Sequence, residues 1–209
     1  YVERMPEDQE EIYYLFGEDL NSITHSPHLD PFKVSGTEVL YLTEPVDSFM
    51  MVAFHEFDDH ALQNIADAEV DAPESEPTGE EVADDLFNPL LARFNDVLGD
   101  RVTAVREAKN LTESPARLVT PEDAMGGDSM ERVRKLVDQD FEASKRVMEI
   151  NRRHPLIRDM ADAFHANALD DLVPQMIDQL YENALLQEGI HPNPAAMADR
   201  GFCHAPQPP

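Results

Sequence analysis

The chain has 209 residues, of which 42% are hydrophobic, and a formal net charge of −27 at pH 7. That hydrophobic fraction supports a packed core in one large or two small domains and argues against a wholly disordered chain. The strong negative charge repels nucleic-acid phosphates and anionic lipid head groups, so neither nucleic acid nor a membrane is expected as a direct partner.

No segment has the pattern of a targeting or membrane-spanning element. The longest apolar run, residues 49–54, is far shorter than the ~20 residues that a membrane helix needs. The first residues lack the basic start and apolar middle of a signal peptide, and the absence of an initiator Met indicates a piece of a longer protein. The single cysteine, Cys203, excludes an internal disulfide and a thiolate zinc cluster, which favours a cytoplasmic location.

Strand and helix patterns alternate over the first 65 residues. Strands are predicted at 12–16, 38–43 and 62–65. The second of these lacks alternation, which is typical of a strand buried on both faces. A polar, helix-like stretch at 19–32 and a helix at 47–57, opened by Pro45, lie between the strands. This order predicts a small three-layer α/β/α unit with parallel strand pairing.

An acidic, Pro-bearing segment at residues 67–79 has almost nothing to bury, so it is predicted as a domain boundary. The predicted organisation is a first domain at 1–70, an acidic linker at 71–79 and a second domain at 80–209. In the second domain, an apolar helix face from Leu90 to Leu98 follows Asn88, a candidate N-cap. Strands are expected at 101–106 and 116–120, and residues 144–150 are ambiguous between helix and strand. We therefore expect an α+β protein overall.

A short amphipathic helix is predicted at residues 129–137, after the glycine pair at 126–127. Its apolar side carries Met130, Val133, Leu136 and Val137, and Met125 lies just upstream. Its opposite side carries Glu131, Arg132, Arg134 and Lys135. Adaptable Met-bearing surfaces are typical of promiscuous binding sites. The alternative is an ordinary helix packed onto the core.

Two further apolar helices are predicted near the end, one opened by Pro155 and one capped by Asp170 or Asp171. The second helix has apolar residues over more than one stripe, which suggests contact with more than one neighbour. Packing against a second chain in a four-helix bundle would satisfy this pattern. An internal core is the alternative.

The sequence contains no complete catalytic motif. His55 and His60 flank acidic residues but are five positions apart, whereas a zinc-binding helix needs His residues four apart. A metal-dependent hydrolase built on these two residues therefore remains a remote alternative. Neither a phosphate-binding Gly-rich loop nor a Gly-x-Ser-x-Gly elbow occurs. Cys203 and His204 are adjacent in a Pro-rich tail that would not orient them as a catalytic pair.

Several short segments, in shared order and spacing, resemble one protein family. In the first part they are residues 1–5 (YVERM), 8–14 (DQEEIYY), 26–29 (SPHL), 38–42 (EVLYL) and 56–58 (EFD). In the second part they are residues 98–102 (LGDRV), 114–116 (SPA), 130–132 (MER), 148–151 (MEIN), 154–155 (HP) and 183–186 (NALL). From Tyr1 to about Arg200 the chain resembles the ninety-kilodalton heat-shock chaperones of the bacterial HtpG type. The matching region is the end of their middle domain followed by their C-terminal dimerisation domain.

The resemblance implies part of an ATP-driven chaperone that forms a homodimer and binds unfolded or partly folded client proteins. The family's ATP and Mg site belongs to a domain upstream of Tyr1, so no catalytic residue, cofactor or metal is expected in this fragment. Client-contact candidates by position are Phe49, Met50, Met125, Met130, Val133, Leu136 and Val137. Dimer-interface candidates in the expected four-helix bundle are Leu156, Met160, Phe164, Leu172, Met176, Ile177, Leu180, Ala184 and Leu185.

Three features depart from the family pattern. Asp59 stands where the family usually has glycine, residues 201–206 cannot continue an apolar final helix, and no Glu-Glu-Val-Asp sequence ends the chain. The cochaperone docking of eukaryotic relatives is therefore not expected. The competing hypothesis is an acidic dimeric scaffold that uses the same helices for one specific protein partner.

Overall fold

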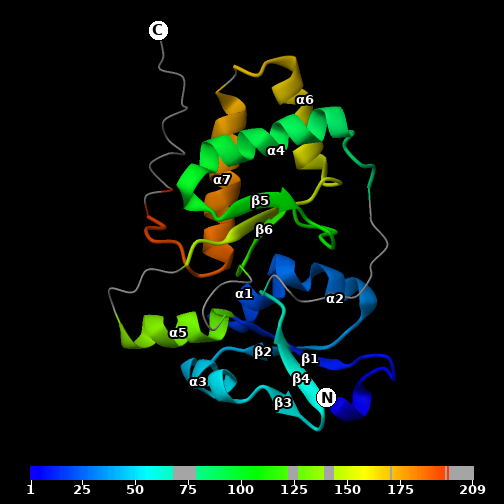
Figure 1. Cartoon of the computed structure of the whole chain (residues 1–209), viewed down its shortest axis with the longest axis vertical. Coiled ribbons are helices and arrows are strands. Elements are labelled where there is room, and N and C mark those ends of the chain that lie inside the picture. The colour runs from blue at the N-terminus through cyan, green and yellow to red at the C-terminus, as the bar shows by residue number, and fades with distance from the viewer. Residues whose placement is uncertain (68–78, 122–126, 139–143, 170, 196, 198–209) are drawn as a thin grey trace.

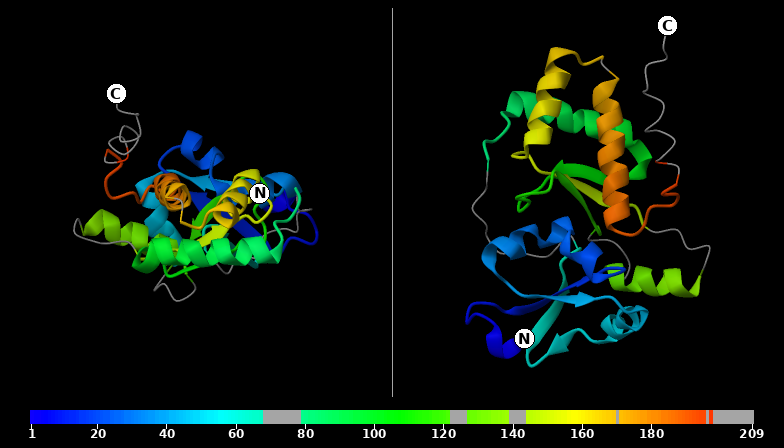
Figure 2. Two further views of the ribbon diagram at one scale, coloured as in Figure 1. Left: turned by 90° about the horizontal axis from the view of Figure 1, so that it is seen from above. Right: turned by 180° about the vertical axis from the view of Figure 1, so that it is seen from behind.

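The computed structural model describes residues 1–67, 79–121, 127–138, 144–169, 171–195 and 197. It contains two small mixed sheets, formed by different parts of the chain and surrounded by helices (Figures 1 and 2). The chain is therefore α+β, as predicted. The predicted linker at 71–79 lies outside the described residues except for Gly79. Of the helices described, none is both long enough and apolar enough to cross a membrane.

The first sheet has the strand order β2-β1-β4-β3. Its strands are β1 (Glu11–Phe16), β2 (Val39–Leu42), β3 (Glu56–Phe57) and β4 (His60–Asn64). The central strand β1 pairs in parallel with β2 and β4, which confirms the predicted parallel arrangement. β3 is antiparallel to β4, and the hairpin between them was not predicted. β1 is central because its residues 12–16 are all buried and apolar.

Helices cover both faces of this sheet. These helical segments are η1 (Val2–Arg4), α1 (Leu20–Thr24), η2 (Pro27–Leu29), α2 (Asp30–Ser35) and α3 (Pro45–Ala53). α1 and α2 pack on the face of Tyr13 and Leu15, whereas Met51 of α3 packs on the face of Tyr14 and Phe16. The predicted helix-like stretch at 19–32 is thus divided at its prolines, and the three-layer arrangement is present.

Two local predictions for the first unit are wrong. α3 ends at Ala53 instead of residue 57, because the chain turns into β3 and reverses at Asp58 and Asp59, which both have positive φ. β2 is not buried on both faces: Leu40 and Tyr41 are partly exposed, since β2 is an edge strand with one neighbour.

The second sheet has the order β5-β7-β6. Its strands are β5 (Ala104–Glu107), β6 (Ala116–Val119) and β7 (Val147–Ile150). The segment that was ambiguous in sequence is the central strand β7, parallel to β5 and antiparallel to β6. Its carboxylate Glu149 is buried between Arg106 and Arg117, at 2.9 and 2.7 Å.

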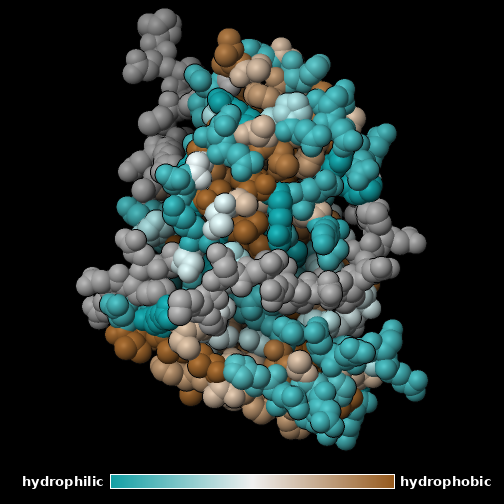
Figure 3. All heavy atoms as spheres, viewed as in Figure 1, coloured by the Kyte–Doolittle hydropathy of each residue, from teal (hydrophilic) through white to brown (hydrophobic). Residues whose placement is uncertain are grey.

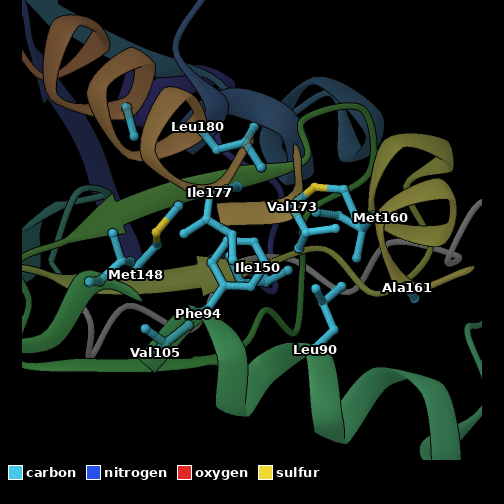
Figure 4. Packing of buried hydrophobic residues seen from close by; sticks show 14 of the residues in the cluster. Leu90, Phe94, Val105, Met148, Ile150, Met160, Ala161, Val173, Ile177 and Leu180 are labelled. Carbon is cyan, nitrogen blue, oxygen red and sulfur yellow. The ribbon is translucent and has the colours of Figure 1, made fainter. Parts of the chain in front are cut away.

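Helices α4, α6 and α7 pack against one another and against this second sheet (Figure 4). They are α4 (Asp84–Leu98), α6 (Pro155–Ala166) and α7 (Leu172–Gln187), and a single turn η3 (Gly99–Arg101) follows α4. α4 begins before Asn88 and continues through Pro89, so Asn88 is not its N-cap. Leu90 and Phe94 are completely buried and point from α4 towards α7, which confirms the predicted apolar face of α4. This core belongs to one chain, and a four-helix bundle between two chains is not shown.

Helix α5 (Gly127–Val137) lies between β6 and β7 in the sequence, but it packs beside α3 of the first unit (Figure 1). The α3 side of the three-layer unit is therefore extended by a helix that comes more than 60 residues later in the chain. The chain thus returns to the first unit and places α5 and α3 side by side.

Candidate functional site

The neighbouring helices α3 and α5 present large apolar side chains to solvent. Phe49 and Met50 on α3 are 48% and 47% exposed, and Leu136 and Val137 on α5 are 50% and 74% exposed. In the space-filling view, apolar residues gather along the lower left edge, where α5 and α3 lie in Figure 1 (Figure 3). The structure thus brings together client-contact candidates from two distant segments. We call these two helices and their exposed apolar residues the α3/α5 surface.

The first turns of helix α5 turn polar side chains inward. Asp128, Ser129 and Glu131 are buried, although Glu131 was predicted to lie on the solvated side. Met130 and Val133 are half-buried, and neither joins the apolar clusters of the core. The alternative prediction, an ordinary helix packed onto the core, is met in part, because α5 packs against α3 while Leu136 and Val137 stay exposed. Met125, another candidate, lies outside the described residues.

Buried ionic contacts hold the polar side of α5 in place. The Asp128 carboxylate lies 2.7 Å from Arg132 Nε and 3.2 Å from Arg146 Nη2. Arg146 Nη2 also lies 2.8 Å from Glu131 Oε2, in an ionic contact without hydrogen-bond geometry. Burial alone would raise the pKa of Asp128, but the two guanidinium groups outweigh burial and hold that pKa below its usual value. Charge pairing therefore holds the first turns of α5 in place, and the helix also packs against α3.

The first sheet contributes further contacts to α5. Asn64 at the end of β4 donates to Asp128 over 3.3 Å, and the Tyr14 hydroxyl is 3.2 Å from that of Ser129. Asp67 forms an isolated β-bridge with Thr120, and its carboxylate lies beside Gly127 at the start of α5. Burial, reinforced by the charge of Asp128, raises the pKa of Asp67 to about 6. These contacts attach α5 to the sheet that carries α3.

A second concave region lies where β1 ends, between α5 and the end of α7. Its lining includes Gly17, Arg132, Lys135 and Glu188. Sheets with parallel strands commonly bind ligands at the carboxyl ends of the strands. Here the lining cations are already engaged, because Arg132 pairs with Asp128 and Lys135 donates to the Gly189 carbonyl over 3.0 Å. The arrangement therefore resembles an internal polar junction between the two parts of the chain.

The two histidines considered for a metal site lie apart from any ligand cluster. His55 follows the end of α3 and is exposed, whereas His60 begins β4 with its Nδ1 2.9 Å from the Glu10 carbonyl oxygen. In the described part of the chain, no three His, Cys, Asp or Glu residues are grouped as a metal site would require.

The dimer-interface candidates divide into two groups. Met160, Ile177, Leu180 and Ala184 are buried in the core of this chain, so in this arrangement they are not available to a second chain. For these four residues, the structure agrees with the alternative of an internal core. Leu156, Phe164, Met176 and Leu185 are partly buried against that core, and Leu172 is 53% exposed. Leu186, which was not a candidate, is 42% exposed on the same helix as Leu172.

Sequence reasoning missed three exposed apolar residues beside the α3/α5 surface: Val46, Phe54 and Phe57. Val46 is on α3, whereas Phe54 and Phe57 follow it, with ring centroids 6.4 Å apart. In the sequence, these residues stand at the two ends of the helix predicted at 47–57. Because that helix was predicted to run to residue 57, Phe57 was interpreted as a helical residue and not as part of a separate strand.

Comparison with known proteins agrees with the resemblance seen in the sequence. Residues 1–201 match the family described as Hsp90 protein, so the chain belongs to the Hsp90 family. It is 42% identical over 190 residues to the chaperone protein HtpG of Chlorobium phaeovibrioides and 42% identical over 194 residues to that of Mycobacterium avium. Each alignment covers 90% of this chain but 30% of the relative, so the chain spans about a third of the length of these curated relatives.

Proposed function

We propose that this chain is the end of the middle domain and the C-terminal dimerisation domain of a cytoplasmic, ATP-dependent Hsp90-type chaperone. The proposed domains are residues 1–70 and 80–209, with the linker at 71–79. ATP and Mg would be bound by a domain outside this chain. The family match over residues 1–201 and the HtpG relatives support the Hsp90-type chaperone part of this proposal.

The proposed role of the fragment is to bind unfolded or partly folded proteins on the α3/α5 surface. The observation that carries this role is the outward orientation of Leu136 and Val137 beside Phe49 and Met50. Large apolar side chains exposed together on two packed helices are typical of a protein-binding surface. Burial of ~400 Å² of apolar client surface corresponds to about 10 kcal/mol before ordering costs, which fits weak, promiscuous binding.

An aggregation assay tests this role. Leu136→Ser plus Val137→Ser should reduce the ability of the chain to suppress aggregation of a chemically unfolded test protein. Leu20→Ser plus Val34→Ser is the matched control, because these residues are similarly exposed but lie on α1 and α2, across the sheet from α3. Equal suppression by all three proteins would exclude the α3/α5 surface as the client site. Tight binding of one partner only would favour the scaffold hypothesis.

Homodimerisation through α6 and α7 is the second part of the proposal. The side chains available for it are Leu172 and Leu186, with the partly buried Leu156, Phe164, Met176 and Leu185 around them. Leu172→Asp should convert a dimer to a folded monomer in sedimentation experiments. Ile177→Asp, in contrast, should unfold the chain because Ile177 is completely buried. A monomeric parent chain at tens of micromolar would refute dimerisation by this fragment.

A further inference from the structure

The α3/α5 surface continues beyond the predicted client contacts onto the edge strand β3. Val46 and Phe57 are 67% and 53% exposed, and Phe54 is 39% exposed beside Phe57. β3 is the outermost strand of its sheet, paired on one side only. The apolar surface therefore has two ends, one at β3 and the other at the end of α5.

The two ends differ in charge. From residue 44 to residue 59 the chain has no Lys or Arg, but it carries the carboxylates Glu44, Asp47, Glu56, Asp58 and Asp59. Glu56, Asp58 and Asp59 surround Phe57 in the sequence and are exposed. The end of α5, in contrast, is mixed in charge: it carries the exposed cations Arg134 and Lys135, and the exposed Asp138 follows Val137. A bound polypeptide would therefore meet carboxylates without cations around the aromatic pair, and charges of both signs at the end of α5.

We propose that this surface selects polypeptide segments in which apolar residues adjoin Lys or Arg, with the basic flank placed at β3. This inference rests on the client-binding role proposed above and adds the chemical class of the segment. The apolar part of the segment covers Phe49, Met50 and Phe57, and its cations face the carboxylates of Glu56 and Asp58. The net charge of −27 disfavours acidic segments over the whole molecule.

Peptide binding by fluorescence anisotropy tests the inference on the 209-residue chain. Three labelled peptides would share one apolar core and differ in a flank of three Lys, three Ser or three Glu. At low salt the Lys-flanked peptide should bind about fivefold more tightly than the Ser-flanked one, from two or three exposed ion pairs. The preference should weaken at 0.5 M salt, because exposed pairs are screened.

Variants separate the local carboxylates from the overall charge. Glu56→Gln plus Asp58→Asn should remove most of the preference for Lys without changing affinity for the Ser-flanked peptide. Asp159→Asn plus Asp162→Asn makes the same change in net charge on exposed positions of α6 and should leave the preference intact. Phe57→Ser should weaken binding of all three peptides.

The outcomes distinguish this inference from the proposed function. Equal affinity for all three peptides would overturn the charge selectivity and leave the client role standing. Failure of every peptide to bind would overturn both. Equal loss of preference in the α6 variant and the β3 variant would also overturn the inference, because the effect would then come from net charge. A Phe57→Ser variant that loses only self-association would assign the surface to a second copy of the chain.

Discussion

Arg146 and Asp128 form an ion pair with Nη2 and Oδ1 3.2 Å apart, and each side chain is 5% exposed. Asp128 is on α5, whereas Arg146 directly precedes the central strand β7 of the second sheet. The pair therefore joins the helix that carries half of the α3/α5 surface to the framework of the second half of the chain.

Replacing Arg146 should be strongly destabilising. Arg146→Met leaves the buried Asp128 and Glu131 carboxylates with less compensation, which costs about 3 kcal/mol or more of unfolding free energy. Urea denaturation measures the loss, and the exposed Arg134→Met on α5 serves as the control, with an expected change below about 0.5 kcal/mol. Similar midpoints for the two variants would show that the buried contacts do not stabilise the fold.

Asp67 should make the free energy of unfolding decrease as the pH rises, whereas most carboxylates of folded proteins have the opposite effect. Its pKa is raised from 3.8 to about 6 by burial and by the charge of Asp128, so the folded state favours its protonated form. The resulting stabilisation is complete below the unfolded pKa and is lost as the pH rises through about 6. A shift of about two units corresponds to at most about 3 kcal/mol.

Asp67→Asn tests this pH dependence. The variant should be more stable than the parent chain at pH 7.5, and the difference should shrink towards pH 4, as measured by urea unfolding at both values. Asp162→Asn, at an exposed site on α6, should show no comparable trend. A variant less stable than the parent at pH 7.5 would mean that the charged carboxylate itself stabilises the fold.

The turn between β3 and β4 should be improved by glycine. Asp58 and Asp59 have φ values of 52° and 64°, which non-glycine residues rarely adopt. Asp59→Gly should stabilise the chain by about 0.5–1 kcal/mol, seen as a higher thermal midpoint. Gly36→Ala is the reciprocal control, because Gly36 ends α2 with a φ of 72°. This variant should be destabilised by a similar free energy. Destabilisation by Asp59→Gly would indicate that the carboxylate itself supports the hairpin.

Gly17, at the end of β1, should tolerate no side chain. A Cβ added there would overlap Cγ1 of Ile23, which is buried on α1. Gly17→Ala should cost about 1–3 kcal/mol through overpacking. The double variant Gly17→Ala plus Ile23→Ala should lose less than the sum of the single changes, because removing the Ile23 side chain relieves the overlap. If the losses of unfolding free energy were additive, the cost of Gly17→Ala would come from the backbone and not from overlap with Ile23.

Much of the fold follows from local sequence patterns. The run of buried apolar residues at 12–16 predicts the central strand, and the spacing of Leu90, Phe94 and Leu98 predicts the buried side of α4. The β3–β4 hairpin was missed because two aspartates in the left-handed region carry no strong turn signal. Strand β7 was ambiguous because short apolar runs suit a helix or a strand, and only its neighbours β5 and β6 decided between them.

The sequence by itself determined the family resemblance, the parallel strands and flanking helices of the first unit, and the amphipathic character of the helix at 127–137. Only the tertiary structure decided which side of that helix faces the protein, because burial of its polar side requires Arg146 to neutralise Asp128 and Glu131. It also placed α5 beside α3 and put Met160 and Ile177 inside one chain. Such outcomes depend on contacts between distant segments, as in the 64-residue separation of Asn64 and Asp128, and local periodicity contains no information about them.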